Sequence, residues 1–283
     1  MASRKNRKQI AQETVAILES GTYRLPDQTE ISIAEQLDFA KSHTKVYTPE
    51  ELDEVVKQTA THNRDFNTEW IVENCTTFAG CRALLETDPE DDVLCLNFAS
   101  AKNPGGGFLN GSQAQEESLS RASGLYACIA PMCDYYDANR ACGTAFYTHH
   151  MIYSPKVPVF RDDEDRLIDQ PWLTSMITAP AVNAGAVSRN EPKRRAKIAS
   201  KMLERIKRVF AVALLHGHES LVLGAWGCGV FKNDPVEVAE WFHYHLGKGG
   251  DFYRAFRRVH FAVLDRTKNL DNYQAFARHF AID

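Results

Sequence analysis

The chain has 283 residues, of which 44% are hydrophobic and 25% are charged, and its formal net charge is -4. This balance gives no whole-molecule attraction to nucleic acid or to anionic membranes, and no segment approaches the roughly 18 consecutive apolar residues of a membrane span. The first twenty residues are basic and then amphipathic, without an apolar secretory core, so we expect a cytosolic compartment, or a nuclear one in a eukaryote.

Cysteine and histidine spacing indicates neither disulfides nor metal. The seven cysteines are odd in number and never spaced as CxxC, which favours buried free thiols in a reducing compartment. None of the ten histidines has a carboxylate or cysteine at the spacing of a zinc site. The sequence therefore predicts no structural zinc.

The N-terminal region reads as helical. Apolar residues between charges predict an amphipathic helix over residues 3–20 that ends at Gly21. Thr48, Pro49 and the two following glutamates are typical of a second helix start. We therefore expect residues 1–65 to form an N-terminal helical extension, and residues 66–283 to form the main domain, which would carry any functional site.

From residue 66 onward, strand and helix patterns alternate as they do in α/β proteins. No linker, repeat or low-complexity tract interrupts them. The predicted strands are 69–74, 93–98, 151–155, 157–160, 175–180, 221–223 and 259–264, and the predicted helices are 77–86, 116–129, 192–216, one from about 235 and one from 272. This order predicts an α/β fold with a ligand site where strands end in loops.

A glycine-rich loop follows the apolar run that ends at Phe98. Gly105, Gly106 and Gly107 are consecutive, so the backbone can approach a ligand closely and adopt positive φ at little steric cost. Successive amides that point the same way form a concave set of donors for a phosphate or a polarised hydroxyl. A mobile surface loop has the same composition, so the glycines alone leave both interpretations open.

Gln115, Glu116 and Glu117 stand at the start of the helix predicted next. A lone acidic pair at this place usually matches the helix dipole. Neighbouring helical residues do not face each other, so the two carboxylates cannot straddle a bond from opposite sides. One acid must therefore transfer protons while the other positions a substrate or tunes its neighbour. Like charges close together raise the pKa of one of them, which keeps a glutamic acid protonated near neutral pH.

At these residues the sequence resembles the microbial-type poly(ADP-ribose) glycohydrolases. The signature of that family is GGG, a short spacer and QEE, and here Gly105–Gly107, seven spacer residues and Gln115–Glu117 fit it without departure. The next segment, Ser120–Tyr126, also resembles the family's continuation. The resemblance extends from about residue 65 to near the C-terminus.

The resemblance implies a macrodomain-like mixed sheet sandwiched between helices, which cleaves ribose–ribose O-glycosidic bonds in poly(ADP-ribose) and releases ADP-ribose, reversing ADP-ribosylation as in the DNA damage response. Glu117 would protonate the leaving ribose oxygen and then deprotonate the attacking water. Glu116 would bind sugar hydroxyls, Asn103 the terminal ribose, and Gln115 would belong to the substrate site. Asn103 precedes a proline, a pair that also starts turns. No metal or organic cofactor is implied.

A second glycine-rich loop follows the predicted strand 221–223. It lacks the glycine order of dinucleotide-binding folds and the lysine of a P-loop, but its amides suit a diphosphate; a plain tight turn is the alternative. The run resembles the diphosphate loop of macrodomains, which implies a substrate site made of Gly224, Ala225, Trp226, Gly227, Cys228, Gly229, Val230 and Phe231. Phe231 would pack on the distal ribose. Asn183 would lie beside the ligand, although Val182 stands where the family often has a proline.

The predicted helix 192–216 carries eight basic residues along one face, which indicates a solvated face or a surface that steers polyanionic poly(ADP-ribose). Two other functions were weighed. A reader that binds ADP-ribose without cutting would have no need for QEE, and a nucleic-acid-binding protein disagrees with the net charge. We therefore expect a monomer that acts on poly(ADP-ribose) or ADP-ribosylated proteins and binds neither membrane nor nucleic acid.

Overall fold

Seven strands form one mixed sheet in the computed structural model, which describes residues 3–281. The strand order is β3 (Lys45–Tyr47), β6 (Met151–Arg161), β7 (Leu167–Ala179), β5 (Leu94–Phe98), β8 (Ser220–Leu223), β9 (Arg258–Ala262) and β4 (Glu69–Glu73). The five strands from β7 to β4 are parallel, whereas β6 and β3 each run antiparallel to their neighbour. The carboxyl ends of β7, β5 and β8 therefore meet at one edge of the sheet.

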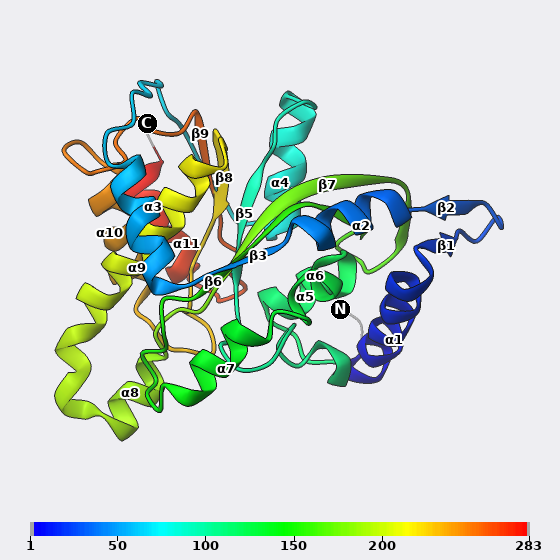
Figure 1. Ribbon diagram of the computed structural model, residues 1–283, viewed down its shortest axis with the longest axis horizontal. Coiled ribbons are helices and arrows are strands. Elements are labelled where there is room, and N and C mark those ends of the chain that lie inside the picture. The colour runs from blue at the N-terminus through cyan, green and yellow to red at the C-terminus, as the bar shows by residue number, and fades with distance from the viewer. Residues whose placement is uncertain (1–2, 282–283) are drawn as a thin grey trace.

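Helices cover both faces of this sheet, which confirms the predicted fold class (Figure 1). Each face of the sheet has its own hydrophobic core. Successive side chains of β5, β8 and β9 point alternately into one core and the other, as strand geometry requires. The first core packs under α3 (Pro49–Thr59), α9 (Ile198–Leu215), α10 (Pro235–Leu246) and α11 (Asp271–Phe280). The second packs under α2 (Ala34–His43), α4 (Thr77–Thr87), α5 (Gln115–Ala122), α6 (Leu125–Ile129) and α7 (Cys133–Ala141).

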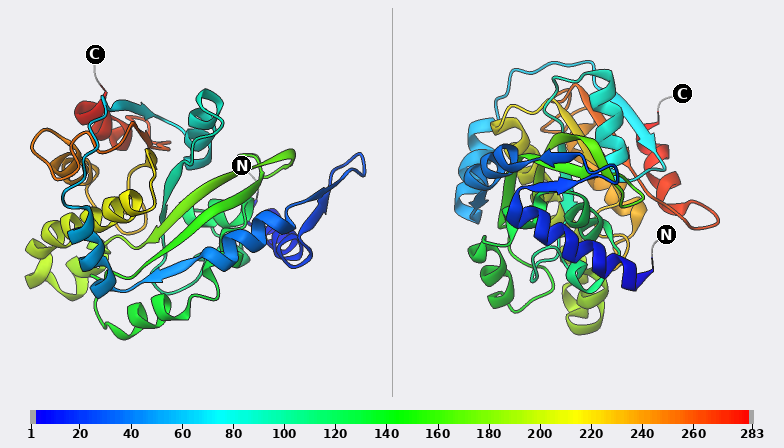
Figure 2. Two further views of the ribbon diagram at one scale, coloured as in Figure 1. Left: turned by 45° about the horizontal axis from the view of Figure 1, so that its top comes forward. Right: turned by 90° about the vertical axis from the view of Figure 1, so that its right-hand side faces the viewer.

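The N-terminal 65 residues are not purely helical. After α1 (Arg4–Ser20), which ends at left-handed Gly21 as predicted, the strands β1 (Thr22–Arg24) and β2 (Glu30–Ser32) form a hairpin that projects from the body (Figure 2). The capping box of Thr48 and Glu51 starts α3 where the sequence predicted a helix. Between them, β3 pairs with β6 as an edge strand of the main sheet, so this region is joined to the core. A domain boundary at residue 65 stays a prediction.

Several predicted elements differ from the structure in their bounds or continuity, among them the helix predicted over 192–216, which is divided into η2 (Pro192–Lys197) and α9. The helix predicted over 116–129 is broken into α5 and α6, because the N–H of Gly124 donates to the carbonyl of Pro158 on β6 at 2.8 Å. The strands predicted at 151–155 and 157–160 form one strand, β6, with a register shift between Ser154 and Val157. The remaining elements are α8 (Ala184–Asn190) and the short 3₁₀ helices η1 (Phe108–Asn110) and η2 (Pro192–Lys197).

All seven cysteines are free thiols, and Cys133 is exposed rather than buried. Within residues 3–281, no helix combines the length and the apolar character that crossing a membrane requires.

Candidate functional site

The two glycine-rich loops leave neighbouring strands at the same edge of the sheet. β5 and β8 pair in parallel, so the loops that follow Phe98 and Leu223 start side by side. Gly224 is packed so closely that a Cβ there would lie 3.1 Å from the Phe98 ring and 2.5 Å from the carbonyl oxygen of Ala262. The segment after β7 joins them, because the N–H of Gly185 donates to the carbonyl of Phe231 at 2.9 Å. The structure thus brings together the three loops that the sequence analysis singled out.

Gln115 anchors the start of α5 to β5. Its side-chain oxygen accepts from the N–H of Phe98 at 2.8 Å, and its nitrogen donates to the Leu96 carbonyl at 2.8 Å and to Thr77 Oγ1 at 3.0 Å. Both polar atoms of the side chain are therefore occupied by protein groups. This anchoring fixes where the next two glutamates lie.

Glu116 is buried, with 3% of its surface exposed. Its carboxyl accepts from the N–H of Ser100 at 2.7 Å and from Asn97 Nδ2 at 3.4 Å. The pKa of Glu116 is raised to about 8, mainly by burial and also by the charge of Glu117, against the opposing effect of the hydrogen bonds from Ser100, Asn97 and Gly105. Glu116 therefore holds its proton near neutral pH.

Glu117 Oε1 accepts a hydrogen bond from the N–H of Gly107 at 3.0 Å. Its Oε2 is buried but has no hydrogen-bond partner within residues 3–281. Gly106, at φ +58°, lies against both acids, because a Cβ there would be 2.5 Å from Glu117 Oε1 and 3.2 Å from Glu116 Oε2. The two carboxyls therefore pack against the same side of one glycine, and one Glu117 oxygen has no partner in the described residues.

The amides of the first loop point at these glutamates. Ser100 donates to Glu116, Gly107 to Glu117, and Gly105 also stabilises the Glu116 carboxylate. The sequence analysis expected this donor set to face a phosphate or sugar hydroxyl. In the structure these amides donate hydrogen bonds to the carboxyls of Glu116 and Glu117, so the loop fixes the positions of both acids.

In the second loop, only part of the backbone remains available. The N–H groups of Trp226 and Cys228 close turns onto the carbonyls of Gly224 and Ala225. Over the described range, the loop amides without a protein partner include those of Gly227, Gly229, Val230 and Phe231. The Trp226 side chain is wholly buried in the core, so this residue can contribute only main chain to a ligand site.

The remaining predicted residues differ in their settings. Phe231 is half-buried and lies against Tyr147, with ring centroids 6.0 Å apart. Asn183 caps α8, its side-chain oxygen accepting from the N–H of Ala186 at 2.9 Å. Asn103 is exposed, and its main chain builds the turn through Ser100 Oγ and the N–H of Gly106.

Two buried asparagines that support the loops were missed by sequence reasoning. Asn97 donates to Glu116 and to Thr178 Oγ1 at 3.1 Å, and the signal for it was a polar residue inside an apolar strand. Asn233 donates to the Val182 carbonyl at 2.8 Å and to that of Gly227 at 3.2 Å. It thereby ties the second loop to the segment after β7, a link that no local pattern reveals.

A group of possible metal ligands lies on β4 and β9. The ligand atoms of Glu73, Cys75 and His260 lie within 4.8 Å of one another. Burial raises the pKa of the Cys75 thiol to about 12, so the thiol is neutral. Three donors with a neutral thiol do not complete the four-ligand shell of a structural zinc site.

The comparisons with known proteins agree with this geometry. Residues 11–162 match the model of the microbial-type poly(ADP-ribose) glycohydrolase catalytic domain. The solved poly(ADP-ribose) glycohydrolase from Thermomonospora curvata superposes with a TM-score of 0.93 at 42% identity, covering 98% of this chain and 100% of that one. The same enzyme bound to the inhibitor ADP-HPD gives 0.91 at the same identity and coverage. The Deinococcus radiodurans enzyme in complex with ADP-ribose gives 0.81 at 43% identity, covering 91% and 98%. Among curated proteins there is no significant match.

Proposed function

This chain belongs to the microbial-type poly(ADP-ribose) glycohydrolases, a glycosidase family, and from that premise we propose that Glu117 is its general acid and base. The observation that carries the proposal is the Glu117 carboxyl itself: Gly107 fixes one oxygen, and the other is buried without a protein partner in the described chain. A held carboxyl with one unengaged oxygen suits proton transfer to a bound substrate.

In the reaction, Glu117 gives its proton to the oxygen of the leaving ribose as the bond from that oxygen to the anomeric carbon breaks. The anomeric centre becomes oxocarbenium-like, and the Glu117 carboxylate then takes a proton from the water that attacks it. The products are ADP-ribose and a polymer shortened by one unit. Glu117 ends in the acid form in which it began.

Glu116 serves the substrate rather than the proton transfer. A neutral carboxyl both donates and accepts hydrogen bonds, so the raised pKa of Glu116 lets it donate to one sugar hydroxyl while it stays bound to Ser100. Its neutrality also removes a second negative charge from beside Glu117.

The second loop binds the diphosphate. Four amides, those of Gly227, Gly229, Val230 and Phe231, have no partner in the described residues and can donate to phosphate oxygens without any arginine. The half-buried Phe231 ring supplies an apolar face for the distal ribose. Solved relatives bind ADP-ribose and the inhibitor ADP-HPD, which supports ADP-ribose as the ligand of this site.

The test compares Glu117→Gln with Glu237→Gln, which changes an exposed acid in the first turn of α10. We expect Glu117→Gln to release ADP-ribose from labelled polymer at least about 100-fold more slowly while ADP-ribose binding is retained. Glu237→Gln should release ADP-ribose at the wild-type rate, since it removes only a favourable interaction of a carboxylate with the helix dipole. Near-normal turnover in Glu117→Gln would overturn the assignment, and wild-type protein that binds the polymer without cutting it would make the chain a reader.

A further inference from the structure

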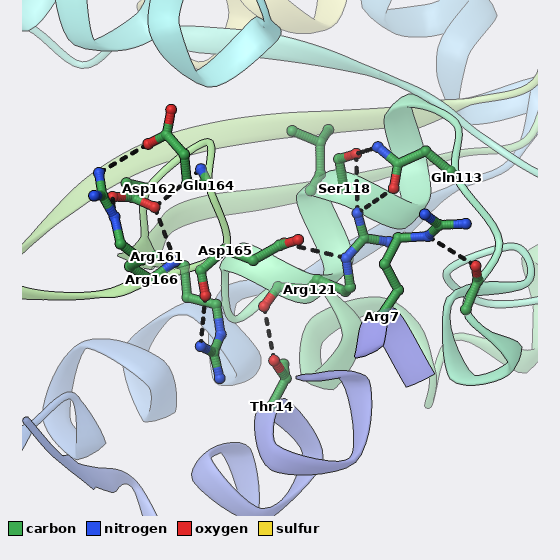
Figure 3. Close-up of polar contacts among 12 residues, drawn as sticks. Arg7, Thr14, Gln113, Ser118, Arg121, Arg161, Asp162, Glu164, Asp165 and Arg166 are labelled. Atoms are coloured by element: carbon green, nitrogen blue, oxygen red, sulfur yellow. Dashed lines mark hydrogen bonds and ion pairs between the residues drawn. The ribbon is translucent and has the colours of Figure 1, made fainter. Parts of the chain in front are cut away.

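Arg121 is a buried arginine on α5, one helical turn beyond Glu117. Its side chain is 2% exposed and pairs with Asp165 in the turn between β6 and β7, with 3.2 Å between Nε and Oδ1. The rest of the guanidinium donates to the Ser112 carbonyl at 3.1 Å and to the side-chain oxygen of Gln113 at 2.6 Å (Figure 3). Its donors thus hold the segment that joins the triple glycine to α5.

That segment leads directly back to Glu117. The N–H of Ser112 donates to the Gly107 carbonyl at 3.1 Å, and a Cβ on Gly107 would lie 2.5 Å from Ser112 Oγ. The N–H of Gly107 in turn donates to Glu117 Oε1. Arg121, Ser112, Gly107 and Glu117 therefore form a closed ring of contacts with two members on α5. The position of Glu117 Oε1 depends on both sides of this ring.

Helix α1 braces the same ring from outside. Its Thr14 donates to the Arg121 carbonyl at 2.7 Å, and its Arg7 donates to the Gly111 carbonyl at 2.9 Å. Gly111 is packed against α1, because a Cβ there would lie 2.3 Å from the Arg4 carbonyl oxygen. Figure 3 shows α1 beneath the cluster and the β6–β7 turn beside it.

A second ion pair connects helix α1 to the sheet. Arg161, near the end of β6, contacts Glu13 of α1 at 2.6 Å and donates to the Asp165 carbonyl at 2.9 Å. The turn that supplies Asp165 is therefore itself held to α1. Segments far apart in sequence thus converge on one guanidinium.

We propose that Arg121 is a positioning residue for Glu117, held in place by Asp165 and by α1. A buried ion pair contributes little net stability because desolvating two charges offsets their attraction. The planar guanidinium of Arg121 instead fixes the positions of the segments around it, since its fork of N–H donors reaches a carboxylate, a carbonyl and an amide oxygen at once. The proposal rests on the proposed role of Glu117.

The main test is Arg121→Lys, which keeps the charge and removes the fork. We expect kcat on poly(ADP-ribose) to fall at least tenfold, while KM and the Kd for ADP-ribose stay within about twofold, because the diphosphate loop is untouched. The matched control is Arg258→Lys, which changes another buried, ion-paired arginine at the opposite edge of the sheet, where β9 begins. This control should lose thermal stability without losing kcat.

Asp165→Asn is the second variant, in case Arg121→Lys does not fold. Asp165 has φ +65°, which asparagine tolerates, so this change removes the charge and keeps the backbone. It should lower kcat in the same direction without weakening ADP-ribose binding. Wild-type kcat in both variants would overturn the proposal, as would a loss of kcat matched by an equal loss of ADP-ribose affinity. If Glu117→Gln is also fully active, the role of Glu117 fails first.

Discussion

At the scale of single residues, Gly106 is the glycine that packs against both acids. An alanine Cβ there would lie 2.5 Å from Glu117 Oε1, and its φ of +58° is left-handed. We expect Gly106→Ala to lower kcat more than tenfold because the Glu117 carboxyl must move, and to cost about 1–2 kcal/mol of stability from the backbone. The measurements are polymer turnover and denaturant unfolding.

Gly249→Ala is the control for that substitution. Gly249 has φ +89°, and an added Cβ meets nothing within 4 Å. It should therefore lose similar stability and keep its activity. Equal kcat in the two variants would show that contact with the acids does not matter.

The buried carboxyl of Glu116 predicts how stability depends on pH. Its pKa rises from 4.5 to about 8 on folding, so the folded state binds this proton more tightly than the unfolded state does. The resulting stabilisation is full below pH 4.5 and is lost as the pH rises toward 8, at about 1.4 kcal/mol per unit of pKa shift. Denaturant unfolding of wild type and Glu116→Gln between pH 5 and 9 measures this term. The variant should lack it, and parallel curves for the two proteins would contradict the expectation.

Sequence reasoning predicted that the triple glycine and QEE lie together, as they do in the structure, but could not predict how the loop amides are oriented. Seven residues separate the triple glycine from QEE, and a loop between a strand and a helix must bring such segments close. The direction of the amides depends on long-range contacts, such as Gln115 with Leu96 and Thr77. No local pattern contains those contacts, so the hydrogen bonds from the loop amides to the acids were not predicted, and contact of this loop with the substrate stays a prediction.

At the scale of elements, helices and strands with a clear capping residue or a regular spacing of apolar residues lie where they were predicted. Elements whose bounds depend on contacts with other parts of the chain differ from the prediction. Thr48 and Asp234 cap α3 and α10 where the sequence placed helix starts. β6 was predicted as two strands divided at Lys156, whereas one strand passes this residue through a bulge with φ +47°. α2 and α7 were not predicted, because their short amphipathic patterns lie between stronger signals.

Arg205 gives a prediction at this scale, since it fastens α9 to two loops. The side chain is wholly buried and donates to the carbonyls of Pro180, Phe146 and Thr148 at 2.8–2.9 Å. Arg205→Met would leave three buried carbonyls without these donors, at about 1–3 kcal/mol each where water does not replace them. We expect a loss of at least about 3 kcal/mol by denaturant unfolding. Arg195→Met, on exposed η2, should stay within about 0.5 kcal/mol.

At the scale of the whole molecule, the structure divides the basic face that the sequence predicted along residues 192–216. On α9, Arg205 is buried, Lys207 pairs with Asp251, and Arg208 pairs with Asp53. On η2, Lys193, Arg195 and Lys197 are exposed, with no ion pair inside the described chain. Within this basic segment, the charge without an ion pair is thus confined to η2, which follows α8, the helix that Asn183 caps near the second glycine-rich loop.

We therefore expect η2 to act on long polymers only. Each unit of poly(ADP-ribose) carries two phosphates, so the Lys193→Gln, Arg195→Gln double variant should raise KM for long chains several-fold at low salt. KM for substrates of two units should change little, and the difference on long chains should vanish at about 0.5 M salt, where the Debye length is only a few Å. The control is Lys248→Gln with Lys268→Gln, two exposed lysines on other segments of the chain. If both double variants raise KM equally, net charge alone sets the effect; if neither does, the basic segment is only a solvated surface.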